Sequence, residues 1–184
     1  MKELVIKNGL LIAPANGYRR ARKDILVKNG RIAAVEDTID WEGPAVDASG
    51  CLVTPGFIDI HTHCYPKAFL GLPPDVLGLE RGASTILDAG STGADTYEDF
   101  RENYVKKSRT KVFTLLNVSK EGLLRGHELD AMEKLDEAAL KATVEKYPHE
   151  IVGLKARASA SVVGEMGLKP IKEAARIAKE IKKP

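Results

Sequence analysis

The stretch VTPGFIDIHTHCYP, residues 53–66, decides the fold of this chain. A mostly apolar run ends here in two histidines, His61 and His63, separated by one residue. Side chains alternate across a strand with a period of two, so Asp59, His61 and His63 share one face. Two imidazoles at one strand end are suitable nitrogen ligands for a divalent metal. A polar strand end that binds nothing is the alternative for so short a motif.

After residue 52 the pattern changes to strands that alternate with helices. The expected strands are residues 56–61, 84–89, 111–117 and 151–157, and helical periodicity covers residues 130–147 and 169–183. This alternation indicates parallel strands and an α/β fold. In a parallel α/β barrel, sites are built at the carboxyl ends of the strands, where His61 and His63 are expected.

The first part of the chain has a different pattern. Residues 1–51 read as short strands separated by turns, and residues 52–184 as the α/β region. Two Asn-Gly dipeptides, Asn8-Gly9 and Asn29-Gly30, each predict a β-hairpin turn between apolar segments. We therefore expect a small N-terminal β domain that precedes the α/β region.

Composition limits the classes of partner. The chain has 184 residues, of which 43% are hydrophobic and 29% charged, as in soluble globular proteins. A net charge of +2 gives no electrostatic reason to expect nucleic acid or an anionic membrane as a partner. The two cysteines, Cys51 and Cys64, form no disulfide framework, so a cytoplasmic location is expected. A small-molecule substrate is the remaining expectation.

Several motifs together resemble one enzyme family. Pro55, Gly56, Asp59, His61 and His63 resemble the amidohydrolase superfamily, in its dihydroorotase, hydantoinase and deacetylase branch. IVGLKARASASVVGEMGL, residues 151–168, resembles the fourth barrel strand of that branch. ILDAGSTGADTYEDFR, residues 86–101, and FTLLNVSKEGL, residues 113–123, resemble the second and third strand ends of its amidohydrolase/deacetylase subgroup. The resemblance implies the first half of a (β/α)₈ barrel, preceded by part of a composite β-sandwich-like domain.

The resemblance also implies a binuclear metal site. His61 and His63 would bind the more buried ion, and a carbamate formed from Lys155 and CO₂ would bridge it to a second ion. Zinc is the expected element, with Mn²⁺, Fe²⁺ and Ni²⁺ as alternatives. The residues themselves agree, because a lysine inside a barrel is unfavourable as an unpaired ammonium. A lysine that extends to the strand end is the alternative.

The implied activity is metal-dependent hydrolysis. Family members act on carbon–nitrogen bonds (amide, cyclic amide, N-acyl) or acyl esters through a metal-bound hydroxide, and the longer protein is expected to form a homo-oligomer. An adenine deaminase-like activity is an alternative within the same family. Such an enzyme needs two metal ions that lower the pKa of a shared water and polarise the scissile carbonyl.

The chain contains only part of the expected site. A (β/α)₈ barrel takes about 250 residues, and roughly half of these follow the β region. The family's proton-shuttle aspartate and two further histidine ligands would lie beyond Pro184. We therefore expect a truncated chain that is inactive alone. A non-catalytic half-barrel that assembles with a partner chain is the alternative.

Three further residues are candidates for binding substrate. Asp88 and Asn117 end the second and third expected strands, and Arg157 shares a strand face with Lys155. A guanidinium suits a substrate carboxylate. The alternatives are structural hydrogen bonds for Asp88 and Asn117 and a salt bridge for Arg157. Cys64 is a poor candidate nucleophile, because no histidine remains to activate it once His61 and His63 bind metal.

Overall fold

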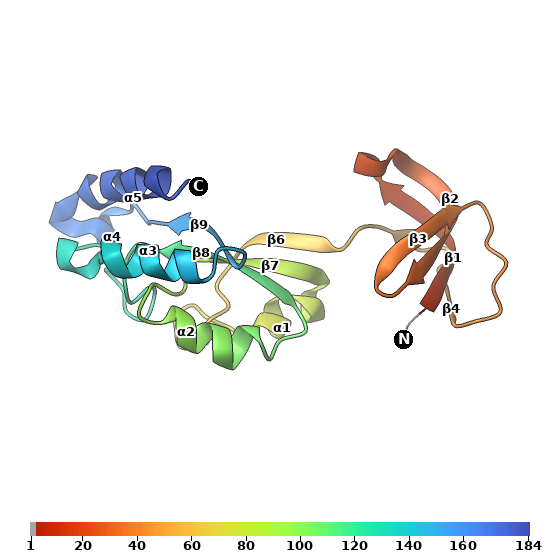
Figure 1. The fold of residues 1–184 in the computed structure, drawn as a ribbon, viewed down its shortest axis with the longest axis horizontal. Coiled ribbons are helices and arrows are strands. Elements are labelled where there is room, and N and C mark those ends of the chain that lie inside the picture. The colour runs from red at the N-terminus through yellow and green to blue at the C-terminus, as the bar shows by residue number, and fades with distance from the viewer. Residues whose placement is uncertain (1–2) are drawn as a thin grey trace. The chain divides into compact units, whose positions relative to one another are not determined.

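The computed structural model describes residues 3–184, which divide into two compact units, one that ends at Pro55 and one that begins at Gly56 (Figure 1). The expected boundary, between residues 51 and 52, lies four residues earlier. The difference arises because Leu52 and Val53 form β5 (Leu52–Val53), which pairs with β1 of the first unit. None of the helices within residues 3–184 is long and apolar enough to cross a membrane.

The first unit is one sheet of five strands. Strand β1 (Glu3–Ala13) pairs antiparallel with β2 (Tyr18–Lys28), and β2 pairs antiparallel with β3 (Arg31–Glu36). Strands β4 (Ala45–Asp47) and β5 pair parallel with β1, and a 3₁₀ turn, η1 (Pro14–Asn16), joins β1 to β2. Leu11, Ala13 and Ile25 form the buried centre of this unit.

One of the two predicted hairpin turns is wrong. Asn29-Gly30 joins β2 to β3 with positive φ at both residues, 51° and 73°, as a tight hairpin requires. Asn8-Gly9 instead lies inside β1, where the pairing with β2 shifts register between Ile6 and Gly9. Asn8 has φ 62°, and its backbone N–H donates to the Asp24 carboxylate at 2.9 Å. The dipeptide therefore makes a β-bulge, because the strand continues beyond it along β2.

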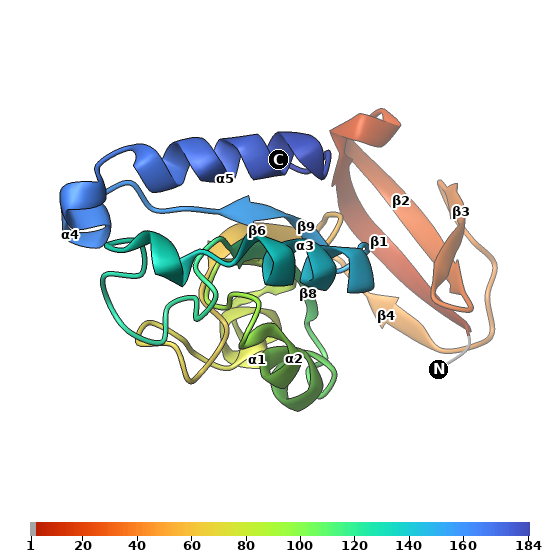
Figure 2. The same ribbon diagram turned by 60° about the vertical axis from the view of Figure 1, so that its left-hand side comes forward.

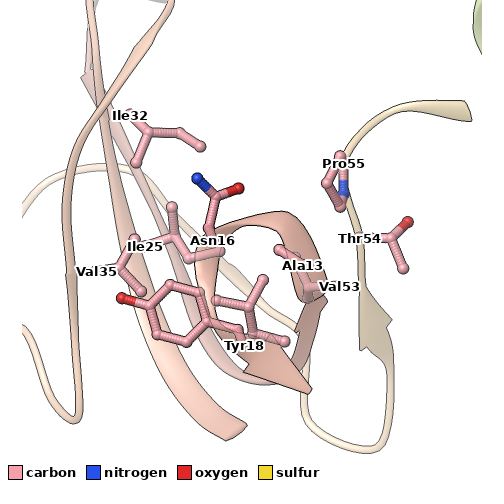
Figure 3. A pocket seen from close by; sticks show the side chains of 10 residues that line it. Ala13, Asn16, Tyr18, Ile25, Ile32, Val35, Val53, Thr54 and Pro55 are labelled. Atoms are coloured by element: carbon pink, nitrogen blue, oxygen red, sulfur yellow. The ribbon is translucent and has the colours of Figure 1, made fainter. Parts of the chain in front are cut away.

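An apolar cavity of about 540 Å³ also lies on the first unit. Tyr18, Ile25, Val35 and Val53 are among the side chains around it (Figure 3). Its lining contains no carboxylate and no imidazole. The lining is mostly apolar, as it is in many cavities that bind small ligands.

The second unit contains the parallel sheet that the sequence predicts. Its strands are β6 (Phe57–Thr62), β7 (Ala83–Ala89), β8 (Lys111–Asn117) and β9 (Ile151–Lys155), hydrogen-bonded in the order β6-β7-β8-β9 with every pair parallel. Strands β6 and β9 are the two edges of this sheet. The predicted α/β class with a parallel sheet is thus confirmed.

Helices and short turns connect the strands. They are α1 (Pro74–Leu77), η2 (Leu79–Arg81), α2 (Tyr97–Phe100), the π-helical η3 (Arg101–Val105), η4 (Met132–Lys134), α3 (Glu137–Lys146), α4 (Ala160–Val163), η5 (Gly164–Met166) and α5 (Lys169–Glu180). Helix α5 lies beside β9 (Figures 1 and 2). The expected helix at residues 130–147 begins only at Glu137, because the Asp136 side chain accepts the Ala139 N–H and caps it there.

The core of the second unit lies between the sheet and these helices. Ile86, Leu116 and Ile151 from the strands pack with buried helix residues such as Phe100 and Ile177. Edge strand β6 differs, because Phe57, Ile58 and Ile60 are 66%, 63% and 71% exposed. The central strands are therefore fixed by burial, whereas β6 is held mainly by its pairing with β7.

Candidate metal site at the strand ends

His61 and His63 lie together at the end of β6. Their ring centroids are 5.5 Å apart, with the ring planes at 76°. Thr62 between them is buried, and its hydroxyl donates to the Leu87 carbonyl of β7 at 3.0 Å. The His61 N–H donates to the Asp59 carboxylate at 3.0 Å, next to a register shift between Asp59 and Thr62. Because Thr62 points into β7, the imidazoles on either side of it come from the same side of the strand.

The environment of His63 favours a neutral ring. The residue is half-buried, and its Nδ1 lies 3.1 Å from the hydroxyl oxygen of Ser91. Burial lowers the pKa of His63, and this effect outweighs the neighbouring Asp88 carboxylate, which raises it. Neutral imidazole is the form that binds a metal, so this environment is compatible with the expected role of His63 as a ligand.

Lys155 reaches the same region from β9. It is the last residue of that strand and pairs opposite Asn117 of β8. Gly90, which follows β7, has φ +84°, and a Cβ built on it would lie 2.6 Å from Lys155 Cβ and 2.5 Å from Cγ. The lysine stem therefore crosses directly over the Gly90 backbone. The charge of Lys155 is also among the causes that lower the pKa of His63, so the two side chains interact through space.

Both carboxylate oxygens of Asp88 accept hydrogen bonds within the chain. It is fully buried at the end of β7. One carboxylate oxygen accepts the Cys64 N–H at 2.8 Å, and the other accepts the Ser91 N–H at 2.7 Å. Asp88 therefore ties the backbone that follows His63 to the loop that follows β7. This geometry corresponds to the alternative in which Asp88 makes structural hydrogen bonds.

Asn117 is used in a similar way. It is 1% exposed, and its side-chain amide donates to the Gly90 carbonyl at 3.0 Å and accepts the Ser119 N–H at 2.9 Å. These bonds hold the loops after β7 and β8 in place. Asn117 thereby supports the Gly90 backbone over which Lys155 passes.

Arg157 is paired within the chain. Its Nε and Nη2 donate to the two carboxylate oxygens of Glu128 at 2.5 and 2.6 Å. Glu128 is 3% exposed, and the pair raises the pKa of Arg157. The guanidinium also lies 5.8 Å from the ring centre of Phe69. A buried carboxylate thus compensates this charge, so its attraction for a substrate carboxylate is reduced.

The remaining histidines and Cys64 do not join this group. The ring of His127 contacts the Ser161 carbonyl, and His149 lies in the turn before β9, at the opposite end of the strand. Cys64 is fully buried, and burial raises the pKa of its thiol well above the ordinary range. A buried neutral thiol is a poor nucleophile.

Two residues of the region were missed by sequence reasoning. Ser91 lies in the loop AGSTG, residues 89–93, and Glu128 lies next to His127 in a long loop. Each contacts a candidate residue that is 28 or 29 positions away in the chain. A strand followed by Gly-Ser-Thr-Gly is the one local signal that could have indicated Ser91.

The donor set fits one side of a divalent metal site. Within residues 3–184 there is no group of three or more His, Cys, Asp or Glu side chains arranged to hold a metal. The candidate metal ligands in this part of the chain are the imidazoles of His61 and His63 and the side chain of Lys155. Imidazole suits zinc and related ions, and the lysine becomes an oxygen ligand only as an anion such as a carbamate.

Known proteins match nearly the whole of this chain. No family model matches the chain. A deacetylase from Enterococcus faecalis is 36% identical over 183 residues, which are 97% of this chain and 47% of that protein. The crystal structure of a dihydroorotase superposes with a TM-score of 0.92 at 29% identity, covering 100% of this chain and 50% of that one. The crystal structure of an adenine deaminase gives a TM-score of 0.87 at 34% identity, covering 99% and 48%.

The chain spans about half the length of the curated relatives it matches. The match nevertheless runs through both units, from the first sheet to α5. It includes the parallel strands that carry His61, His63 and Lys155. The chain therefore belongs to the amidohydrolase superfamily, a family of hydrolases, and corresponds to the N-terminal half of its members.

Proposed function

We propose that the protein is a metal-dependent hydrolase that cleaves an amide, cyclic amide, N-acyl or acyl-ester bond of a small molecule. One observation carries the proposal: the imidazoles of His61 and His63 lie 5.5 Å apart at the end of β6, and Lys155 crosses Gly90 toward the same strand ends. In parallel α/β folds, catalytic groups collect at these ends.

The proposed metal ligands are His61, His63 and carbamylated Lys155, which would bridge two divalent ions. Bound ions of this kind activate a water and polarise the scissile carbonyl. Zinc is the element we propose, and a structural neighbour of 21% identity, an N-acyl-D-glutamate deacylase, has been crystallised with zinc and a phosphonate inhibitor. The chain's own contribution is a neutral His63 and a lysine whose stem passes through the space that Gly90 leaves open.

The substrate-binding roles expected for Asp88, Asn117 and Arg157 do not form part of this proposal. Their hydrogen bonds are used within the chain, as described above. An anionic substrate is correspondingly less favoured, because Glu128 already compensates the charge of Arg157. We further propose that the protein acts in the cytoplasm as a homo-oligomer, with residues 1–51 as part of a composite β domain.

Two other functions have a specific observation in their favour. The match to an adenine deaminase at 34% identity favours deamination of a purine by the same site. The exposed apolar side chains of edge strand β6 favour a half-barrel that assembles with a partner chain. The two experiments below separate these functions from hydrolysis.

The first experiment measures bound metal. The chain is loaded with Zn²⁺ and bicarbonate, desalted, and its zinc content is compared with that of His61→Ala and of the control His149→Ala. His61→Ala should retain well under half of the bound zinc, because it removes one of the proposed ligands. His149→Ala should retain all of it, since His149 lies at the opposite strand end. Full occupancy in His61→Ala would rule out the proposed site.

The second experiment measures turnover. The 184-residue chain, and the same chain joined to any natural downstream sequence, are assayed on dihydroorotate, hydantoins, N-acetyl amino acids, acetylated hydroxy acids and adenine. We expect the longer protein to hydrolyse an amide or ester and the 184 residues alone to be inactive. General acid–base transfer alone contributes about 10²–10⁴-fold, and we propose that the proton shuttle belongs to the part of the relatives' length that these 184 residues do not match. Equal metal-dependent rates for both proteins would contradict this expectation.

A further inference from the structure

A buried hydrogen-bond network connects His63 to the loop after β7. Ser91 is fully buried, and its hydroxyl oxygen lies 3.1 Å from His63 Nδ1. The Ser91 N–H donates to one oxygen of Asp88, and the N–H of Cys64, the residue after His63, donates to the other. One buried carboxylate therefore holds both the backbone beside His63 and the backbone that carries the serine hydroxyl.

This network fixes more than the position of the backbone. An imidazole on a strand end can rotate, and it can present either nitrogen to a metal. Here Nδ1 is occupied by the Ser91 hydroxyl, so Nε2 is the nitrogen left for a ligand. A metal-bound histidine almost always donates its second ring N–H to a neighbouring acceptor, which sets the ring orientation and the tautomer. Ser91 is placed to be that acceptor.

We propose that Ser91 and Asp88 are positioning residues. They fix the His63 ring so that it binds metal through Nε2. The inference rests on the proposed function only in naming a metal as the ligand. The ring orientation itself belongs to the metal-free chain. Asp88 acts through two backbone N–H groups, and Ser91 acts through its hydroxyl on the ring.

The test uses Ser91→Ala, which removes the hydroxyl and leaves the Ser91 N–H bond to Asp88 possible. Ser84→Ala is the matched control, because the Ser84 hydroxyl also links β7 to β6, through the Phe57 carbonyl at 3.3 Å, without contacting a histidine. Zn²⁺ affinity is measured by titration against a competing chelator. Ring ¹⁵N NMR of His63 is recorded on the metal-free and the Zn²⁺-loaded chain.

Loss of an outer hydrogen-bond partner typically lowers metal affinity 10–100-fold, and we expect a loss in this range for Ser91→Ala and none for Ser84→Ala. The metal-free wild-type chain should show one dominant His63 tautomer, and the variant a mixture like that of a free imidazole. With Zn²⁺, the wild-type chain should show Nε2 coordination. Asp88→Asn, which spoils one of the two N–H contacts, should also weaken Zn²⁺ binding.

Two results would overturn the proposal. An unchanged His63 tautomer in metal-free Ser91→Ala would show that the hydroxyl does not fix the ring, whatever happens to affinity. Unchanged Zn²⁺ affinity in that variant would show that the fixed ring does not matter for binding. If the wild-type chain binds no Zn²⁺, the proposed function fails, whereas the metal-free spectra still decide whether Ser91 fixes the ring.

Discussion

Replacing Gly90 by alanine should separate the cost of a backbone conformation from the cost of displacing Lys155. Gly90 has φ +84°, where a residue with a Cβ is strained by about 1–2 kcal/mol. Its new Cβ would also lie 2.5 Å from Lys155 Cγ and 2.6 Å from Lys155 Cβ. These atoms are close to the lysine backbone, so they cannot swing away as the end of the side chain could. Overpacking of this kind costs about a further 1–3 kcal/mol.

Gly82→Ala is the matched control for this substitution. Gly82 lies in the same unit with φ +86°, and no atom lies within 4 Å of the position that its Cβ would occupy. It therefore carries the conformational strain without the clash. The effect of alanine on the unfolded chain, about 0.4–1 kcal/mol, is common to both variants and cancels in the comparison.

The assay is native-state hydrogen exchange of the β8 amides, which reports the free energy of opening the second unit. Gly82→Ala should lower this free energy by at most about 1–2 kcal/mol, because the effect on the unfolded chain offsets part of the strain, and Gly90→Ala should lower it by about 1–3 kcal/mol more. Gly90→Ala should also bind less Zn²⁺ than the control, since Lys155 must move. Equal destabilisation by the two substitutions would refute the reasoning that the Lys155 stem needs the space that Gly90 leaves open.

Two further predictions concern charged groups in the second unit. Glu128→Gln should destabilise the second unit by about 2 kcal/mol in chemical denaturation, because it leaves the Arg157 guanidinium without its buried charged partner. The cost is moderate because Arg157 is partly exposed to water. The control Glu133→Gln, at an exposed position, should change the free energy of unfolding by less than about 0.5 kcal/mol. Equal effects of Glu128→Gln and Glu133→Gln would contradict a stabilising role of the Arg157–Glu128 pair. Asp75 accepts hydrogen bonds from the hydroxyls of Ser108 and Thr110 and from nearby backbone N–H groups, which hold its pKa well below the usual range. A lowered pKa in the folded state stabilises the fold above the unfolded pKa of about 4, and this contribution is lost as pH falls from there toward the folded pKa. Asp75→Asn should therefore lower the melting temperature at pH 7 and flatten its fall in acid, as measured by circular dichroism; an acid profile parallel to that of the wild-type chain would count against this role.

Much of the fold follows from local sequence patterns. The alternation of strands and helices after residue 52 predicts a parallel sheet, and the structure has four parallel strands in sequence order. The two-residue period also predicts that His61 and His63 lie on the same side of their strand, and their rings are neighbours. Both features depend on the geometry of a few consecutive residues, so the sequence alone contains the necessary information.

The same kind of local information was insufficient for Asn8-Gly9. Two such dipeptides look alike in sequence, but one closes a hairpin and the other makes a bulge inside β1. The difference depends on what the following residues pair with. After Gly9, Leu10 and Leu11 continue along β2, so no turn forms there. Pairing with a distant strand therefore decided the conformation of a short segment.

The partners of the polar side chains near the site were decided only by the tertiary structure. Asp88, Asn117 and Arg157 could each face a substrate as far as their strand positions indicate. In the fold, Asp88 bonds the Cys64 N–H 24 residues away, Asn117 the Gly90 carbonyl 27 away, and Arg157 the Glu128 carboxylate 29 away. Strand periodicity determines which way a side chain points. Which group meets it there depends on how separate strands and loops pack, because buried polar groups take the partner that the packed chain brings within hydrogen-bond distance.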